Sequence, residues 1–152
     1  MNEKTTVEVY LSFEKYEANW DFSLAKVTDR LGIFPTETEK KGEWITRENK
    51  KIRQHQSTMW KYSTGEVETY ESEKLVQQIV HTFKDKTDII NTLKNELLIE
   101  PSLCMVVYVI NGRNPSYIIE KDLMDFSLLI DVELEIDCYT YGFVEEEEFT
   151  IE

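Results

Sequence analysis

Three carboxylates, Glu133, Glu135 and Asp137, occupy every second position in the sequence ELEIDCYTY near the end of the chain. A spacing of two places side chains on one face of a β-strand, so these acids are expected to lie side by side. Grouped carboxylates can bind a metal ion or exchange protons with a substrate. A strand with one solvent-facing side needs the same alternation, and we favour that interpretation. The inward-facing residues of this strand would be Leu134, Ile136 and Cys138.

The other chemically versatile residues do not form a complete catalytic set. His55 and His81 lack a His, Cys or carboxylate partner at a metal-binding spacing such as HExxH. The five glycines are too far apart to form GxGxxG or a P-loop, and turns or helix caps explain each of them. We therefore expect a protein that is not an enzyme and that needs no cofactor and no metal.

Charge is the most informative feature of the composition. The net charge is −13, and residues 99–152 carry 13 acids against two bases, Arg113 and Lys121. Residues 1–98 are nearly balanced, with 17 acids and 15 bases. Such a protein repels nucleic acid and anionic membranes, and it attracts basic proteins. We expect a basic protein partner, no nucleic acid and no membrane.

The negative charge of the C-terminal third is densest at four consecutive glutamates, Glu145 to Glu148. Acidic runs of this kind are often interaction tails. The following EFTIE alternates again, which favours a further edge strand as the alternative to a free tail. The candidate partner-binding residues are Glu133, Glu135, Asp137, Tyr139, Tyr141, Glu145, Glu146, Glu147, Glu148 and Trp44.

Trp44 and a basic cluster stand apart from the acidic segment. Trp44 lies in a polar stretch, where a partner contact and packing beneath a loop are both open. The sequence RENKKIRQH, residues 47–55, is most simply a solvated loop. It could instead pair with the acidic C-terminal third.

Apolar periodicity predicts an α+β domain in which strands and helices alternate. Strands are predicted at residues 6–16, 58–62, 102–112 and 132–141, with a weak strand or loop at 43–52 and a short strand at 116–119. Helices are predicted at residues 21–31, 71–98 and 120–130, and the polar KDKTD predicts a bend or split in the second. The apolar run at 102–112 suggests a strand covered on both faces. The order predicts a mostly antiparallel sheet with helices on one face and a split βαβ (ferredoxin-like) core, plus an extra helix and strand.

Length and cysteine content limit the organisation of the protein. The 152 residues fit a single α+β domain spanning 1–152. Cys104 and Cys138 give neither a disulfide framework nor a metal spacing. The N-terminal sequence lacks a signal peptide, and we expect a cytoplasmic protein that is a monomer or a homodimer.

Three segments resemble a known family in their order and spacing: LGIFPTETEKKGEW from Leu31, MWKYST from Met59 and LEIDCYTYG from Leu134. Together they resemble the bacterial domain-of-unknown-function 4279 family over essentially the whole chain. The resemblance implies a small bacterial α+β domain, with no established reaction and no catalytic residues to carry over. Some small bacterial proteins of this general kind look like immunity proteins of toxin systems.

Two functional hypotheses follow. The first is a non-enzymatic protein-interaction domain, of the kind an immunity protein represents, that neutralises a basic nuclease-type toxin through an acidic surface. The second is a small-molecule-binding or catalytic domain with a site near Trp44, Trp60 and the carboxylates of the last strand. A homodimer that pairs through an edge strand is a further, structural possibility.

Overall fold

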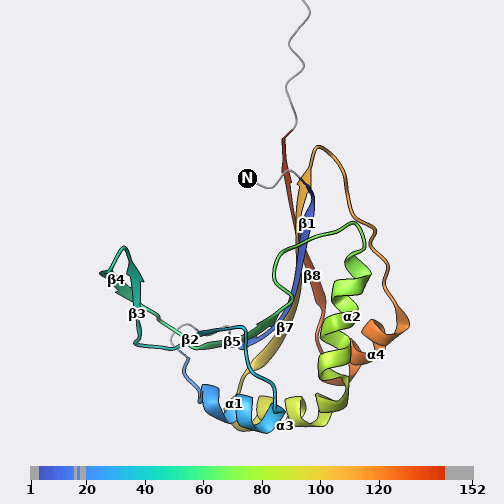
Figure 1. Ribbon diagram of the computed structural model, residues 1–152. Helices are drawn as coiled ribbons and strands as arrows, with labels where there is room; N and C mark the ends of the chain where they lie inside the picture. Colours follow the sequence, from blue (N-terminus) through green and yellow to red (C-terminus); the bar gives the residue numbers. More distant parts are fainter. Residues whose placement is uncertain (1–3, 16, 18–19, 143–152) are drawn as a thin grey trace, which may run out of the picture.

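A six-stranded sheet forms the centre of the molecule in the computed structural model, which describes residues 4–15, 17 and 20–142 (Figure 1). The strand order is β2-β5-β1-β7-β8, and β6 also pairs with β1. These strands are β1 (Thr6–Glu14), β2 (Glu37–Glu39), β5 (Met59–Ser63), β6 (Val67–Glu68), β7 (Glu100–Ile110) and β8 (Leu134–Tyr141). A separate two-stranded sheet consists of β3 (Trp44–Arg47) and β4 (Lys50–Gln54).

The strand order contains the predicted ferredoxin-like core. Strands β1, β5, β2 and β7 pair only in antiparallel fashion with one another, and β5 lies between β1 and β2. This arrangement is the split βαβ unit, in which a third strand separates two strands linked by a helix. The extra strand β8 pairs with β7 in parallel, because helix α4 (Lys121–Ile130) connects the two as a crossover. The predicted α+β class and its mostly antiparallel sheet are confirmed.

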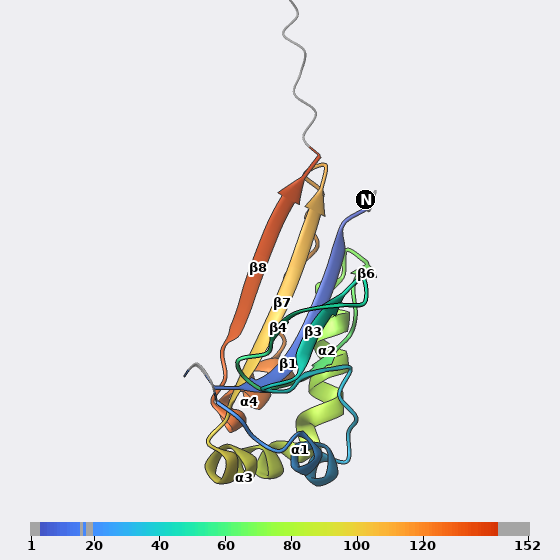
Figure 2. The same cartoon turned by 90° about the vertical axis from the view of Figure 1, so that its left-hand side faces the viewer.

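The helices cover one face of the sheet only. Helices α2 (Ser72–Phe83) and α4 lie beside the strands, and α1 (Leu24–Leu31) and α3 (Thr87–Leu97) lie at one end (Figure 1). Figure 2 views the sheet from its other side, where no helix stands in front of β1, β7 and β8. The core lies on the covered side, where alternate residues of β1 are completely buried: Val7, Val9, Leu11 and Phe13.

Local sequence signals set the helix ends. Ser23 accepts a hydrogen bond from the backbone N–H of Lys26 at 3.2 Å, which caps the start of α1. Gly32 ends this helix in the left-handed region at φ 67°, a conformation that costs little without a Cβ. The predicted 71–98 helix is split into α2 and α3 by a 3-10 turn at Lys84–Lys86, within the polar KDKTD segment.

Several sequence predictions need correction. The second core strand is the short, polar β2, whereas the predicted weak strand at 43–52 is the β3–β4 hairpin outside the main sheet. The predicted strand at 116–119 forms only an isolated bridge between Ser116 and Glu71. The strand at 102–112 is predicted to be covered on both faces, but in the described part of the chain the helices cover only one face of β7, and Val106, Tyr108 and Ile110 on the other face are half-buried.

Trp60 on β5 fills the centre of the core, so its removal is expected to destabilise the protein. Its indole is completely buried between the rings of Phe13 and Phe83, and its Nε1 donates to Thr28 Oγ1 at 3.0 Å. We expect Trp60→Ala to lower the free energy of unfolding by about 3–5 kcal/mol, because it leaves a cavity.

Chemical denaturation of the variant and the wild type gives this difference. Trp44→Ala is the matched control, since Trp44 is 48% exposed and its loss should cost less than about 1 kcal/mol. Equal effects of the two substitutions would contradict this placement of the core.

Candidate functional site

The sheet face turned away from the helices, called here the open face, gathers side chains from six strands. Residues directly opposite each other in a sheet point to the same side, so the registers define this face. Its members from β1, β2, β5 and β6 are Thr6, Glu8, Tyr10, Ser12, Glu14, Glu37, Glu39, Met59, Lys61, Ser63 and Glu68. Its members from β7 and β8 are Glu100, Ser102, Cys104, Val106, Tyr108, Ile110, Glu135, Asp137, Tyr139 and Tyr141.

The open face is strongly acidic. These residues include eight carboxylates and one amine, that of Lys61. The Lys61 amine lies 3.4 Å from Glu37, 3.9 Å from Glu8 and 4.1 Å from the centre of the Tyr10 ring. The Lys4 amine lies 3.8 Å from Glu68, and these two cations leave most of the negative charge of the face uncompensated. The face is therefore complementary to a basic surface.

A group of tyrosines occupies the β7–β8 end of the open face. The rings of Tyr108 and Tyr139 stack with centres 5.5 Å apart, and Tyr141 lies 6.1 Å from Tyr108. Tyr139 and Tyr141 are about half exposed. Tyrosine offers a large, rigid contact area with a polar tip, and exposed tyrosines are frequent anchors of protein interfaces.

Cys104 lies beneath the acids in the middle of the open face. Its thiol donates to Asp137 Oδ2 at 3.6 Å, and it is 2% exposed. Burial raises the pKa of this thiol, and it also raises the pKa of the neighbouring Tyr10 hydroxyl, which hydrogen-bonds to Cys104. Both groups therefore stay protonated at neutral pH, and neither has the depressed pKa of an activated nucleophile.

Carboxylates from three strands interact at Glu14. Burial raises the pKa of Glu14, and the negative charges of Glu39 and Glu135 raise it further, whereas Lys61 lowers it. A raised carboxyl pKa means that the ionised form of Glu14 is less stable in the folded protein, so burial and then the neighbouring acids oppose folding at neutral pH.

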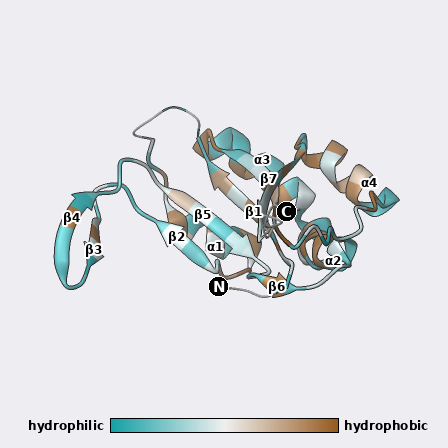
Figure 3. Cartoon of the chain, turned by 90° about the horizontal axis from the view of Figure 1, so that it is seen from above, coloured by the Kyte–Doolittle hydropathy of each residue, from teal (hydrophilic) through white to brown (hydrophobic). Residues whose placement is uncertain are grey.

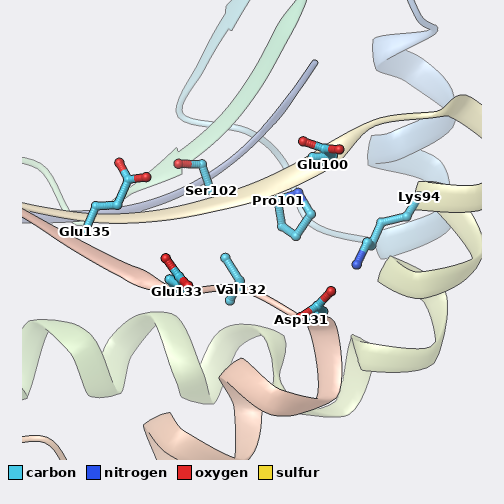
Figure 4. Close-up of a pocket in the computed structure, with 8 residues that line it drawn as sticks. All are labelled: Lys94, Glu100, Pro101, Ser102, Asp131, Val132, Glu133 and Glu135. Atoms are coloured by element: carbon cyan, nitrogen blue, oxygen red, sulfur yellow. The ribbon is translucent and has the colours of Figure 1, made fainter. Parts of the chain in front are cut away.

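A cavity of about 420 Å³ lies at the end of the sheet where β7 and β8 begin to pair (Figure 4). Its lining residues are Lys94, Glu100, Pro101, Ser102, Asp131, Val132, Glu133 and Glu135. Lys94 Nζ donates to the Ile130 carbonyl at 2.8 Å. Within the described part of the chain, none of the four carboxylates pairs with a cation within 4.0 Å. The cavity can therefore accept a cationic group.

The structure brings together part of the predicted partner-binding set. Glu135, Asp137, Tyr139 and Tyr141 share the open face, and Glu133 lines the cavity next to it. Trp44 lies apart, on the separate β3–β4 hairpin. The predictions for Glu145 to Glu148 and for EFTIE fall outside the residues that the structure describes.

The last strand turns Leu134, Ile136 and Cys138 toward the helix side of the sheet, as predicted, but the predicted burial holds only for Leu134. Leu134 packs against the core, but Ile136 is 44% exposed and Cys138 is exposed as well. Strand β8 ends the sheet order, and the helix layer covers only its start (Figure 2).

Sequence reasoning missed the acids that the N-terminal half brings to the open face, namely Glu8, Glu14, Glu37, Glu39 and Glu68. A signal for two of them exists in the alternation of residues 6–14, where Glu8, Tyr10, Ser12 and Glu14 are the polar side of a half-buried strand. The near-balanced charge of residues 1–98 hides them, because most bases of this segment, such as those of the β3–β4 hairpin, lie off the open face.

The structure does not assemble the alternative site around Trp44, Trp60 and the last strand. Trp60 is buried on the covered side of the sheet, whereas Glu135 and Asp137 lie on the opposite side. Among the described residues there is no group of three or more His, Cys, Asp or Glu side chains placed to hold a metal ion. In the same part of the chain, no helix is long and apolar enough to cross a membrane.

The fold and the open face define a small α+β domain with a ferredoxin-like core and an acidic, tyrosine-bearing sheet surface. Residues 3–141 match the model of the family described as "Domain of unknown function (DUF4279)", and the chain belongs to this family. The comparison with curated proteins gives no match, and neither does the comparison with solved structures.

The raised pKa of Glu14 leads to a pH-dependent prediction. Folding stability linked to a raised carboxyl pKa is fully present below the unfolded value of about 4.3 and is lost as the pH rises through the folded pKa. We expect Glu14→Gln to raise the free energy of unfolding at pH 7. The gain should be less than about 1 kcal/mol, because solvent screens a half-exposed group.

Urea denaturation between pH 3.5 and pH 8 measures this gain, which should disappear below about pH 4 because wild-type Glu14 is then protonated in both states. Glu43→Gln, an exposed substitution outside the open face, should change stability by less than about 0.5 kcal/mol at every pH. A loss of stability in Glu14→Gln at pH 7 would contradict the repulsion.

Proposed function

We propose that this chain is a non-enzymatic protein-interaction domain that binds a basic protein through its open face. The mode of binding would be that by which an immunity protein neutralises a nuclease-type toxin. The acidity of the open face is the observation that carries the proposal: eight carboxylates and one amine share a surface that no helix covers.

The electrostatics of the open face favour a protein partner that carries many positive charges. Such partners include nucleases, whose substrates are polyanions, and an acidic surface can occupy the same positive groups that bind nucleic acid. Complementary charge accelerates association and makes the rate fall as salt increases. Tyr139 and Tyr141 supply the apolar and aromatic contact that charge alone does not give.

The cavity beside the open face could bind one basic side chain of the partner and so anchor it. Its four carboxylates surround a space of about 420 Å³, in which an arginine or lysine side chain of the partner would find several acceptors. Glu135 belongs to both the cavity and the open face, so one side chain of the partner could enter the cavity while the surrounding surface contacts the strands.

Removal of two central charges tests the proposal. The partner is first captured from lysate of the native host with wild-type chain as bait, and its affinity is then measured by surface plasmon resonance at several salt concentrations. We expect Glu135→Gln with Asp137→Asn to weaken binding by at least about tenfold, mainly through slower association and a shallower salt dependence.

Asp29→Asn with Asp125→Asn is the matched control, because it removes the same charge from exposed positions on α1 and α4. Capture of only acidic or neutral proteins, or equal losses in the two double variants, would overturn the proposal. A toxin gene adjacent to this one would identify the partner directly, and the purified chain should then inhibit that toxin.

The same cavity favours a second candidate function, binding of a small organic polycation. Its volume lies in the range of ordinary ligand sites, about 300–1,000 Å³. Isothermal titration calorimetry with spermidine at low salt tests this function. We expect saturable one-to-one binding that Glu100→Gln with Glu133→Gln weakens by at least about tenfold. If the wild type and the variant both gave weak, non-saturating heats, spermidine would be attracted only by the general acidity of the chain. That result would contradict this second function.

A further inference from the structure

The β3–β4 hairpin is exposed to solvent and, among the residues that the structure describes, does not pack against the body of the domain. It forms a sheet separate from the main one, and Figures 1 and 3 show it standing clear of the strands and helices of the body. Every residue of β4 is exposed, as are all residues of β3 except Ile45. Isolated two-stranded hairpins are at best marginally stable in water, so an exposed hairpin of this kind gains from contact with another surface.

The hairpin is nevertheless held in a defined direction. Glu48 and Asn49 both have positive φ, at 51° and 61°, as the tight turn of a two-residue hairpin requires. At its base, backbone hydrogen bonds join Gly42 N–H to the His55 carbonyl at 2.9 Å and His55 N–H to the Glu43 carbonyl at 2.8 Å. These bonds extend the hairpin ladder, and the Thr58 N–H donates to the Trp20 carbonyl at 3.0 Å, which ties the base of the hairpin to the body of the domain.

The hairpin surface is basic and aromatic. It carries four bases and one acid, Glu48, and the bases are Arg47, Lys50, Lys51 and Arg53. Among the described residues, none of the four bases forms an ion pair within 4.0 Å. Trp44 and Ile52 are 48% and 55% exposed, and the Lys51 amine lies 5.4 Å from the centre of the Trp44 ring.

The open face of the same chain has the matching properties. Its carboxylates outnumber its amines by eight to one, and Tyr139 and Tyr141 offer rings to which guanidinium and ammonium groups bind. Tryptophan, tyrosine and arginine are the residues that dominate interface energies, and the two surfaces together carry all three. Charge complementarity therefore identifies a second copy of this chain as the occupant that both surfaces fit.

We propose that the β3–β4 hairpin docks onto the open face of a second copy, and that two copies exchange hairpins around a two-fold axis. Figure 1 shows the sheet edge-on, with the hairpin rising on the same side that the open face looks toward. Because both surfaces lie on one side, two facing molecules can satisfy both contacts at once, which closes the assembly as a dimer.

Exchange of hairpins has a consequence for partner binding. The dimer covers the open face, so a basic partner would have to displace the hairpin of the second copy. The net charge of −13 repels the two copies over long distances, but salt screens this repulsion beyond about 8 Å at physiological ionic strength. Contacts between the hairpin and the open face act within that range. The proposal uses the open face of the proposed function and does not need a foreign partner.

A charge-exchange experiment on the full chain tests the dimer. One variant carries Lys51→Glu and Arg53→Glu on the hairpin, and the other carries Glu135→Lys and Asp137→Lys on the open face. Sedimentation equilibrium at about 0.15 M salt should show wild-type dimers that dissociate toward about 0.5 M salt. Each variant alone should be monomeric, with the dimer dissociation constant raised at least about 100-fold, because like charges then face each other.

Mixing the two variants provides the decisive measurement. In the mixed dimer one contact is native and the other has both charges reversed, so both are complementary and a one-to-one heterodimer should form. The matched control is Lys84→Glu with Lys121→Glu, which reverses two charges at exposed positions away from the hairpin and should leave the wild-type dimer unchanged. Far-ultraviolet circular dichroism verifies that each variant is folded.

Three results would overturn the proposal. They are a wild-type chain that is monomeric at all concentrations and salt levels, a dimer indifferent to the hairpin variant, and monomeric variants that remain monomeric after mixing. The second would place the contact elsewhere, for example at the β8 edge. These results are distinguishable from failure of the proposed function. A monomeric chain would still bind its partner through Glu135 and Asp137, whereas a dimer could form in a chain that captures no basic protein.

Discussion

The antiparallel register of β1 with its neighbours β5 and β7 is the constraint on which the rest of the molecule depends. Side chains along a strand alternate between the two faces, and the register holds this alternation in step across the sheet. Helices cover one face only, so the apolar members Val7, Val9, Leu11 and Phe13 must point toward them. The polar members of the same strands are then forced together on the open face.

This arrangement concentrates negative charge beyond what any one segment carries. Burial raises the pKa of Glu14, and the acids Glu39 of β2 and Glu135 of β8 raise it further. The one lysine among the strand residues of this face is shared by two carboxylates. A surface selected for stability alone would intersperse the two signs of charge. The proposed binding of a basic partner would give this unfavourable crowding a role, because natural proteins depart from local stability rules mainly at functional sites.

The hairpin gives the fold a second feature that stability does not explain. It is inserted between two adjacent core strands, β2 and β5, and it forms a sheet of its own that stands clear of the main sheet (Figure 1). The core strands on either side pair with each other directly, so the ferredoxin-like core does not need the insertion. Its exposed basic and aromatic side chains are the observation on which the proposed exchange of hairpins rests.

Local sequence patterns determined much of this protein. A cap at Asp21 or Ser23, the end of α1 at Gly32, the split at KDKTD and the alternation of strands and helices can be predicted, because capping and apolar periodicity act within a few residues. The grouping of Glu135 and Asp137 on one side of the last strand follows from their spacing. The short, polar β2 could not be predicted, because pairing with β5 rather than its own composition makes it a strand.

Only the tertiary structure decided which surfaces are free and which residues share them. That Ile136 and Cys138 are exposed depends on β8 being the last strand of the sheet and on how far α4 extends over it. The effect of the Glu135 charge on the pKa of Glu14 depends on pairing between strands that are far apart in sequence. The alternation of apolar and polar residues shows which side chains of a strand share a face. The position of that strand in the sheet, and the elements that cover each face, are set by long-range packing.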